Sequence, residues 1–105
     1  MMEHRWDVRV HAPMNVVVHT AEGTTLSSLT HNISHGGVFV EIDDPGYAES
    51  NRDIEKKKVV WLEFKEDQFA ETLPALVVRR SRKTAALMFI THPPALRPFL
   101  NRLNW

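Results

Sequence analysis

The residues LPALVVRR-SRK-TAALMFI, at positions 73–90, decide the fold that this sequence predicts. Two largely apolar runs, 73–80 and 84–90, have the length of β-strands and flank a polar connection at 81–83. A connection this short joins neighbouring antiparallel strands. The stretch therefore predicts a β-hairpin.

Four more strand-like segments precede this hairpin. They contain many β-branched residues, are separated by turn signals, and lie at about residues 9–20, 24–33, 37–43 and 59–64. In the third segment Val38, Val40 and Ile42 recur at every second position, which is the pattern of a half-buried strand. Short strands in this arrangement favour an all-β, antiparallel fold over alternating β and α units.

Six strands are enough to close a sheet into a barrel, so we expect a six-stranded antiparallel β-barrel. Leu96, Phe99, Leu100 and Leu103 follow at the spacing of one helix face. They predict a short amphipathic C-terminal helix within residues 94–105 that caps the barrel, with Pro98 near its first turn. The polar segment at 44–58 predicts a long loop, either a functional lid or a mobile excursion.

Length and composition predict a single domain spanning residues 1–105, because 43% hydrophobic and 25% charged residues are ordinary values for a globular chain. Thirteen Lys and Arg balance thirteen Asp and Glu, so any anion site must be local. The chain has no Cys, which excludes disulfides and thiol chemistry and agrees with a cytoplasmic location. No apolar run approaches the ~20 residues of a membrane span, so we expect no membrane insertion.

The segment RWDVR, at residues 5–9, is the first candidate for binding chemistry. In an extended chain Arg5, Asp7 and Arg9 point to one side and the apolar residues between them point to the other. Each guanidinium fork can donate paired hydrogen bonds to phosphate oxygens or to the O6 and N7 acceptors of guanine. Taken alone, an arginine pair near a terminus is more often a solvated tail.

The segment HNISHGG, at residues 31–37, is the second candidate. Asn32 and Ser34 are two residues apart, so we expect both on one face with Ile33 in the core. The Asn amide offers a donor and an acceptor, and the Ser hydroxyl can serve a base or a phosphate. Gly36 and Gly37 permit positive φ and a close approach of backbone to ligand. A plain turn is the alternative interpretation, because turns favour the same residue types.

In this order, the two segments resemble the RxxxR and [D/N]xSxxG motifs of PilZ domains, and the strand pattern and final helix resemble that family over nearly the whole chain. The resemblance implies a six-stranded barrel that binds cyclic di-GMP, a bacterial second messenger. Arg5 and Arg9 would grip phosphates and guanine edges, in a mobile segment at residues 1–9 that folds over the nucleotide. Asn32 and Ser34 would hold a base and a nearby phosphate, and Gly37 would leave room.

The implied function is a receptor that changes conformation and signals to an unidentified downstream protein, without catalysis and without a cofactor besides the ligand. His4 and Gly36 are further candidates for ligand contact. Many relatives carry Arg where His4 stands, and that Arg favours an intercalated pair of nucleotides. Whether the chain binds one nucleotide or two is therefore left open. Ala86 stands where relatives often have Gly, and we expect little effect on the ligand.

Other interpretations of the sequence fit its residues less well. The six histidines contain no helical metal-binding pair and have no Cys to join them, so no metal site is predicted. The basic run at 79–83 is interpreted as a solvated hairpin tip, with an extra anion contact as the alternative. Two other functions stay open: a PilZ-like adaptor that acts through protein contacts without nucleotide, and a barrel that binds single-stranded nucleic acid. The zero net charge argues against the second, so neither DNA nor RNA is an expected partner.

Overall fold

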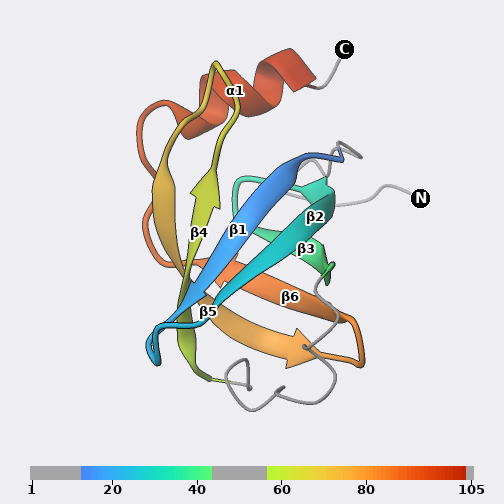
Figure 1. Ribbon diagram of the computed structural model, residues 1–105. Coiled ribbons are helices and arrows are strands. Elements are labelled where there is room, and N and C mark those ends of the chain that lie inside the picture. The colour runs from blue at the N-terminus through green and yellow to red at the C-terminus, as the bar shows by residue number, and fades with distance from the viewer. Residues whose placement is uncertain (1–12, 44–56, 104–105) are drawn as a thin grey trace, which may run out of the picture.

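The computed structural model describes residues 13–43 and 57–103, which form six strands and one helix (Figure 1). In chain order the elements are β1 (Asn15–Thr20), β2 (Thr25–Ile33), β3 (Gly37–Ile42), β4 (Val59–Phe64), β5 (Thr72–Arg80), β6 (Thr84–Phe89) and α1 (Leu96–Leu103). The strands close into a barrel in the order β1-β2-β3-β6-β5-β4, and each neighbouring pair is antiparallel. The predicted fold is confirmed.

Element boundaries agree with the prediction to within one residue for the last five strands. Of the first predicted strand, residues 9–12 lie outside the described part of the chain, and β1 begins at Asn15. The helix is shorter than the predicted range of 94–105. It starts only after Pro93 and Pro94, because proline has no N–H to donate to the hydrogen bonds of a helix interior. Pro98 lies in the first turn of the helix, as predicted. Of the predicted loop, residues 44–56 lie outside the described part.

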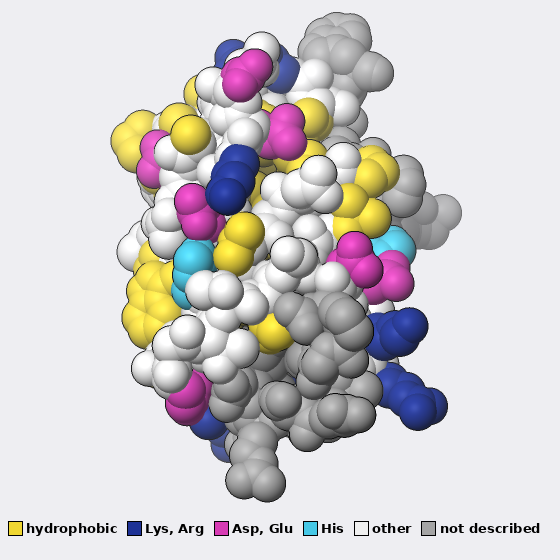
Figure 2. All heavy atoms as spheres, in the orientation of Figure 1, with side chains coloured by type: hydrophobic (Ala, Val, Ile, Leu, Met, Phe, Trp, Pro, Cys, Tyr) yellow, Lys and Arg dark blue, Asp and Glu magenta, His cyan; other side chains and the backbone are white. Residues whose placement is uncertain are grey.

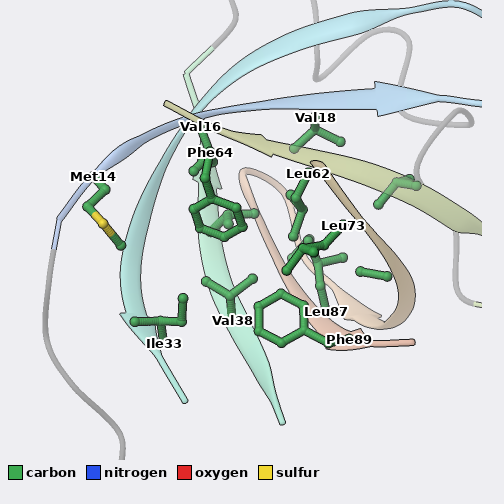
Figure 3. Packing of buried hydrophobic residues seen from close by; sticks show 14 of the residues in the cluster. Met14, Val16, Val18, Ile33, Val38, Leu62, Phe64, Leu73, Leu87 and Phe89 are labelled. Atoms are coloured by element: carbon green, nitrogen blue, oxygen red, sulfur yellow. The ribbon is translucent and has the colours of Figure 1, made fainter. Parts of the chain in front are cut away.

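The inward-facing residues of each strand form the core and fill the interior of the barrel (Figure 3). In β4, for example, Val60, Leu62 and Phe64 are buried while the residues between them face outward. Figure 3 shows side chains from β1, β3, β4 and β6 converging on the same interior space. Full burial of each such side chain stabilises the fold by roughly 1.5–3 kcal/mol. The period-two burial of β1, β3, β4 and β6 explains why these strands could be located from their pattern.

Helix α1 covers one end of the barrel (Figure 1). Its Phe99 ring stacks on Phe69 with centroids 4.8 Å apart and planes 13° apart, and Phe69 meets Phe64 edge-on at 5.2 Å. Leu96, Phe99 and Leu100 are buried. The predicted capping role is thus confirmed by direct contacts. Within the described residues, no helix has the length and apolar character that crossing a bilayer requires.

A surface pair between neighbouring strands supports a prediction about pH. His19 Nε2 on β1 lies 2.8 Å from Glu63 Oε1 on β4, and this hydrogen bond holds the pKa of Glu63 below its ordinary value. A carboxylate with a lowered pKa in the folded state contributes stability above its unfolded pKa and loses it as the pH falls through the folded pKa. Glu63→Gln should therefore be less stable than wild type at neutral pH.

The difference should be small, because both side chains are 37% exposed and solvent screens the pair. It should shrink once the pH falls below the ordinary pKa of glutamate, and vanish where the pH lies below the lowered pKa of folded Glu63, because the wild-type carboxylate is then protonated. Urea unfolding of both proteins at neutral and acidic pH measures it. A stability gap of equal size at both pH values would contradict this assignment.

Candidate functional site

A β-bulge in β2 turns Asn32 toward the outside of the barrel. Leu26, Ser28 and Thr30 are buried, so strict alternation would place Asn32 inside. The pairing of β2 with β3 instead shifts between Thr30 and Asn32, so Ile33 becomes the buried residue and Asn32 is partly exposed. An inserted residue exchanges the faces of all residues after it. Ile33 lies in the core as predicted, but the bulge that places it there was not foreseen.

Ser34 organises the turn that joins β2 to β3. Its Oγ accepts hydrogen bonds from the Gly36 N–H at 3.2 Å and the Gly37 N–H at 3.3 Å. The Ser34 N–H donates to the Gly37 carbonyl at 2.8 Å. Ser34 is only 8% exposed, so a ligand that contacts its hydroxyl must share it with these bonds. The turn interpretation of this segment is confirmed, and the ligand contact of Ser34 stays a prediction.

The two glycines bring this turn close to β6. The Phe89 N–H donates to the Gly36 carbonyl at 2.9 Å. A Cβ added at Gly37 would overlap the Leu87 carbonyl oxygen and lie 3.2 Å from Met88 Cα. Neither glycine has a positive φ, so this turn does not use the conformational freedom that glycine permits. Gly37 is needed because the backbones of β3 and β6 approach too closely for a side chain.

The turn borders a pocket of about 450 Å³ on the outer surface of the barrel. The pocket spans β2, β3, β6 and β5. These four strands follow one another around the barrel (Figure 1). Its lining includes four residues of the predicted motif, three apolar side chains and one guanidinium: Asn32, Ser34, Gly36, Gly37, Phe39, Val78, Met88 and Arg79. The volume lies in the usual range of small-molecule sites.

Arg79 also lines the pocket, whereas the favoured sequence interpretation places it at a solvated hairpin tip and an anion contact is only the alternative. The pairing of β5 with β6 shifts between Val77 and Arg79, and this second bulge leaves both Val78 and Arg79 exposed. Leu73, Ala75 and Val77 face inward, so strict alternation would bury Arg79. A buried unpaired guanidinium is prohibitively unfavourable. That conflict was the available signal for a bulge.

The combination of groups in the pocket suits a planar, hydrogen-bonding ring that carries an anionic group. Asn32 supplies an amide that can both donate and accept. Val78 and Met88, which are 44% and 48% exposed, offer apolar contact to a ring face. Arg79 is the one charged side chain among the described residues that line the pocket, and it is positive. Figure 2, which shows one face of the molecule, has side chains of both charge signs.

A stacked pair of histidines ties the turn to the segment that precedes α1. The rings of His35 and His92 have centroids 4.7 Å apart and planes 21° apart. His35 belongs to the turn, whereas His92 lies between β6 and α1.

A third histidine, His31, is paired with a carboxylate: its Nε2 lies 2.8 Å from Glu41 Oε1. In the described part of the chain, no three His, Cys, Asp or Glu side chains are grouped so as to hold a metal ion.

Three predicted site residues, His4, Arg5 and Arg9, lie outside the described residues, so their contacts stay predictions. The other four, Asn32, Ser34, Gly36 and Gly37, are brought together in the pocket.

A comparison with known protein families points to the same family as the two sequence motifs. The family model of the PilZ domain matches residues 3–103, which is nearly the whole chain. The chain belongs to the PilZ family. No curated protein matches this PilZ domain.

Solved structures of other proteins have the same fold. The PilZ domain of CeSA from a cellulose-synthesizing bacterium is 20% identical with a TM-score of 0.69, and the match covers 92% of this chain and 94% of that one. The PilZ domain of YcgR from Escherichia coli, solved with c-di-GMP, is 14% identical with a TM-score of 0.70, covering 97% and 89%. The Bacillus subtilis inhibitor of motility, MotI/DgrA, is 20% identical with a TM-score of 0.70, covering 97% of this chain and 50% of that one. At these identities the likeness establishes the shared fold.

Proposed function

We propose that this PilZ domain is a receptor for cyclic di-GMP and not an enzyme. The observation that carries the proposal is the single pocket that Asn32, Ser34, Gly36 and Gly37 line together with Arg79. Membership of the PilZ family and the c-di-GMP in the related YcgR structure support the choice of ligand.

The chemistry of the ligand matches the groups available. Cyclic di-GMP carries two guanine bases and two phosphodiester anions. The Asn32 amide can pair with a guanine edge, and the exposed apolar surface of Met88 can contact the face of the ring. Arg79 supplies one positive charge at the pocket. Arg5 and Arg9 would supply the charge that the second phosphate needs.

Isothermal titration calorimetry with cyclic di-GMP tests the proposal. We expect saturable heat with the protein at tens of micromolar, and a stoichiometry that decides between one nucleotide and two. Cyclic di-AMP is the matched control, because adenine lacks the O6 acceptor that an arginine fork reads in guanine. Absence of heat with cyclic di-GMP, from protein shown to be folded by circular dichroism, would sink the proposal.

Replacing Arg79 with alanine should weaken cyclic di-GMP binding about tenfold. A hydrogen bond to a charged group contributes roughly 1.5–3 kcal/mol, and about 1.4 kcal/mol corresponds to a factor of ten. We take the lower limit because Arg79 is exposed. Arg82→Ala is the control, since it removes the same charge from the exposed hairpin tip outside the pocket. Equal affinities for the two variants would show that Arg79 does not contact the nucleotide.

The receptor would act through a conformational change of residues 1–9 and a downstream protein in the cytoplasm. Limited trypsin digestion, which cuts after Arg5 and Arg9, reads this change directly. Cleavage at these positions should slow when cyclic di-GMP is added. A partner protein that is retained equally with and without nucleotide would instead support an adaptor function.

A further inference from the structure

The outer face of β4, β5 and β6 carries apolar side chains where the outside of a barrel is usually polar. Leu76 on β5 pairs with Val59 on one side and Met88 on the other, which forms one row of apolar side chains across the three strands. Next to it, Pro74 pairs with Trp61 and accepts a hydrogen bond from the Ile90 N–H, which forms a second row. We call these two rows the apolar face.

The apolar face is accessible to a partner. Trp61 is 37% exposed, and Met88 and Ile90 are each 48% exposed. These are three of the four large hydrophobic side chains that are exposed among the described residues. The fourth, Val78, lies on β5 two residues after Leu76. Adjacent strands lie about 4.8 Å apart, so the rows form one continuous patch. Contiguous exposed apolar patches mark interaction sites. The left edge of Figure 2 shows hydrophobic side chains on the side where β4 and β5 lie.

Charges of opposite sign lie at the two ends of this face. At one end, residues 79–83 contain four Lys or Arg and no acid, and the backbone of Lys57 and Lys58 bonds to Val77 beside them. At the other end, where β4 runs into β5, residues 63–71 contain Glu63, Glu66, Asp67 and Glu71 against one lysine, Lys65. Strand β4 separates the two ends by roughly 15–20 Å.

This arrangement is self-complementary. A two-fold axis that lies in the plane of the interface, at right angles to the strands, would place the apolar rows of two chains against each other and reverse the strand direction. The basic end of each chain would then lie over the acidic end of its partner, as an isologous interface requires. The chain has no net charge, so two copies do not repel each other at long range.

We propose that two copies of this chain associate through the apolar face to form a symmetric dimer. Two short rows of side chains form the patch, so we expect a weak dimer, with a dissociation constant on the order of tens of micromolar. Met88 belongs both to the apolar face and to the pocket lining, so the dimer is a form of the protein without nucleotide, and its test does not depend on the proposed function.

Sedimentation velocity of the full chain over roughly 5 to 500 µM at low salt measures the association. The wild-type mass should rise from 12.1 kDa toward twice that value. Ile90→Glu should stay monomeric over the same range, because it buries a carboxylate against apolar side chains. Ser27→Glu, at an exposed position on β2 away from this face, should associate as wild type does.

Charge exchange tests the geometry of the dimer. The double variant Arg82→Glu, Lys83→Glu removes the net charge of residues 79–83, so that only the acidic end keeps its charge. Glu66→Lys, Asp67→Lys makes both ends basic, because residues 63–71 then carry three lysines and two acids. Each should self-associate at least about tenfold more weakly than wild type, and an equimolar mixture should recover dimer mass. A wild-type chain that stays at 12.1 kDa overturns the proposal, as does Ile90→Glu associating like wild type or a mixture that fails to recover.

Discussion

Replacing Arg9 with alanine should weaken cyclic di-GMP binding by about 100-fold or more. The ligand carries two phosphodiester anions, and the described lining of the pocket holds one cation, Arg79. We propose that Arg5 and Arg9, which lie outside the described residues, supply further charge, because alternate residues of an extended segment would point to one side. Removing one partner of a desolvated charge pair costs about 2–5 kcal/mol, and a 100-fold loss corresponds to about 2.7 kcal/mol.

Calorimetry on Arg9→Ala and Arg9→Lys separates charge from geometry. Lysine keeps the positive charge but loses the planar fork, so Arg9→Lys should bind with intermediate affinity. Arg82→Ala again controls for the change of net charge, because it lies in the hairpin tip outside the pocket. An Arg9→Ala protein that binds within a few-fold of wild type would refute the assignment of Arg9 to the site.

Replacing Gly37 with alanine should lower the melting temperature by roughly 10 °C or more. The added Cβ would overlap the carbonyl oxygen of Leu87, and this neighbour is backbone that cannot rotate away. Strands β3 and β6 would have to separate where Gly37 pairs with Met88. Overpacking of this kind costs about 1–3 kcal/mol or more, and each kcal/mol shifts the melting temperature of a domain this size by roughly 4–8 °C.

Gly23→Ala is the matched control for this substitution. Gly23 has a φ of +92° in the β1–β2 turn, and a Cβ there meets no atom within 4 Å. Its replacement tests conformational strain without a clash, which costs about 1–2 kcal/mol. Thermal unfolding followed by circular dichroism compares the two variants. If Gly37→Ala melts at or above the temperature of Gly23→Ala, the proposed close packing of β3 on β6 is wrong.

The barrel could be predicted because the pattern that encodes each strand is local. The alternation of Val60, Leu62 and Phe64 with outward residues lies within one strand, and the three-residue connection at 81–83 makes β5 and β6 neighbours directly. The spacing of Leu96, Phe99 and Leu100 likewise lies within one helix. Such signals need no knowledge of distant contacts.

The candidate site could be predicted only in part. The residue types of the NISHGG segment indicated a turn with hydrogen-bonding capacity, and the structure has that turn beside a pocket. The segment did not indicate that Arg79, more than 40 residues further along the chain, lines the same pocket. That proximity depends on β6 lying between β3 and β5.

The residue pattern alone therefore determines the six strands, the closing helix and the motif around Asn32 and Ser34, because each is encoded within a short segment. The closed strand order and the two bulges follow from long-range pairing. In the closed barrel, β2 pairs with β3 and β5 pairs with β6. The bulges before Asn32 and Arg79 allow both pairings and turn these two side chains outward. The close contact of Gly37 with Leu87 has the same origin, since it exists only when β3 lies against β6.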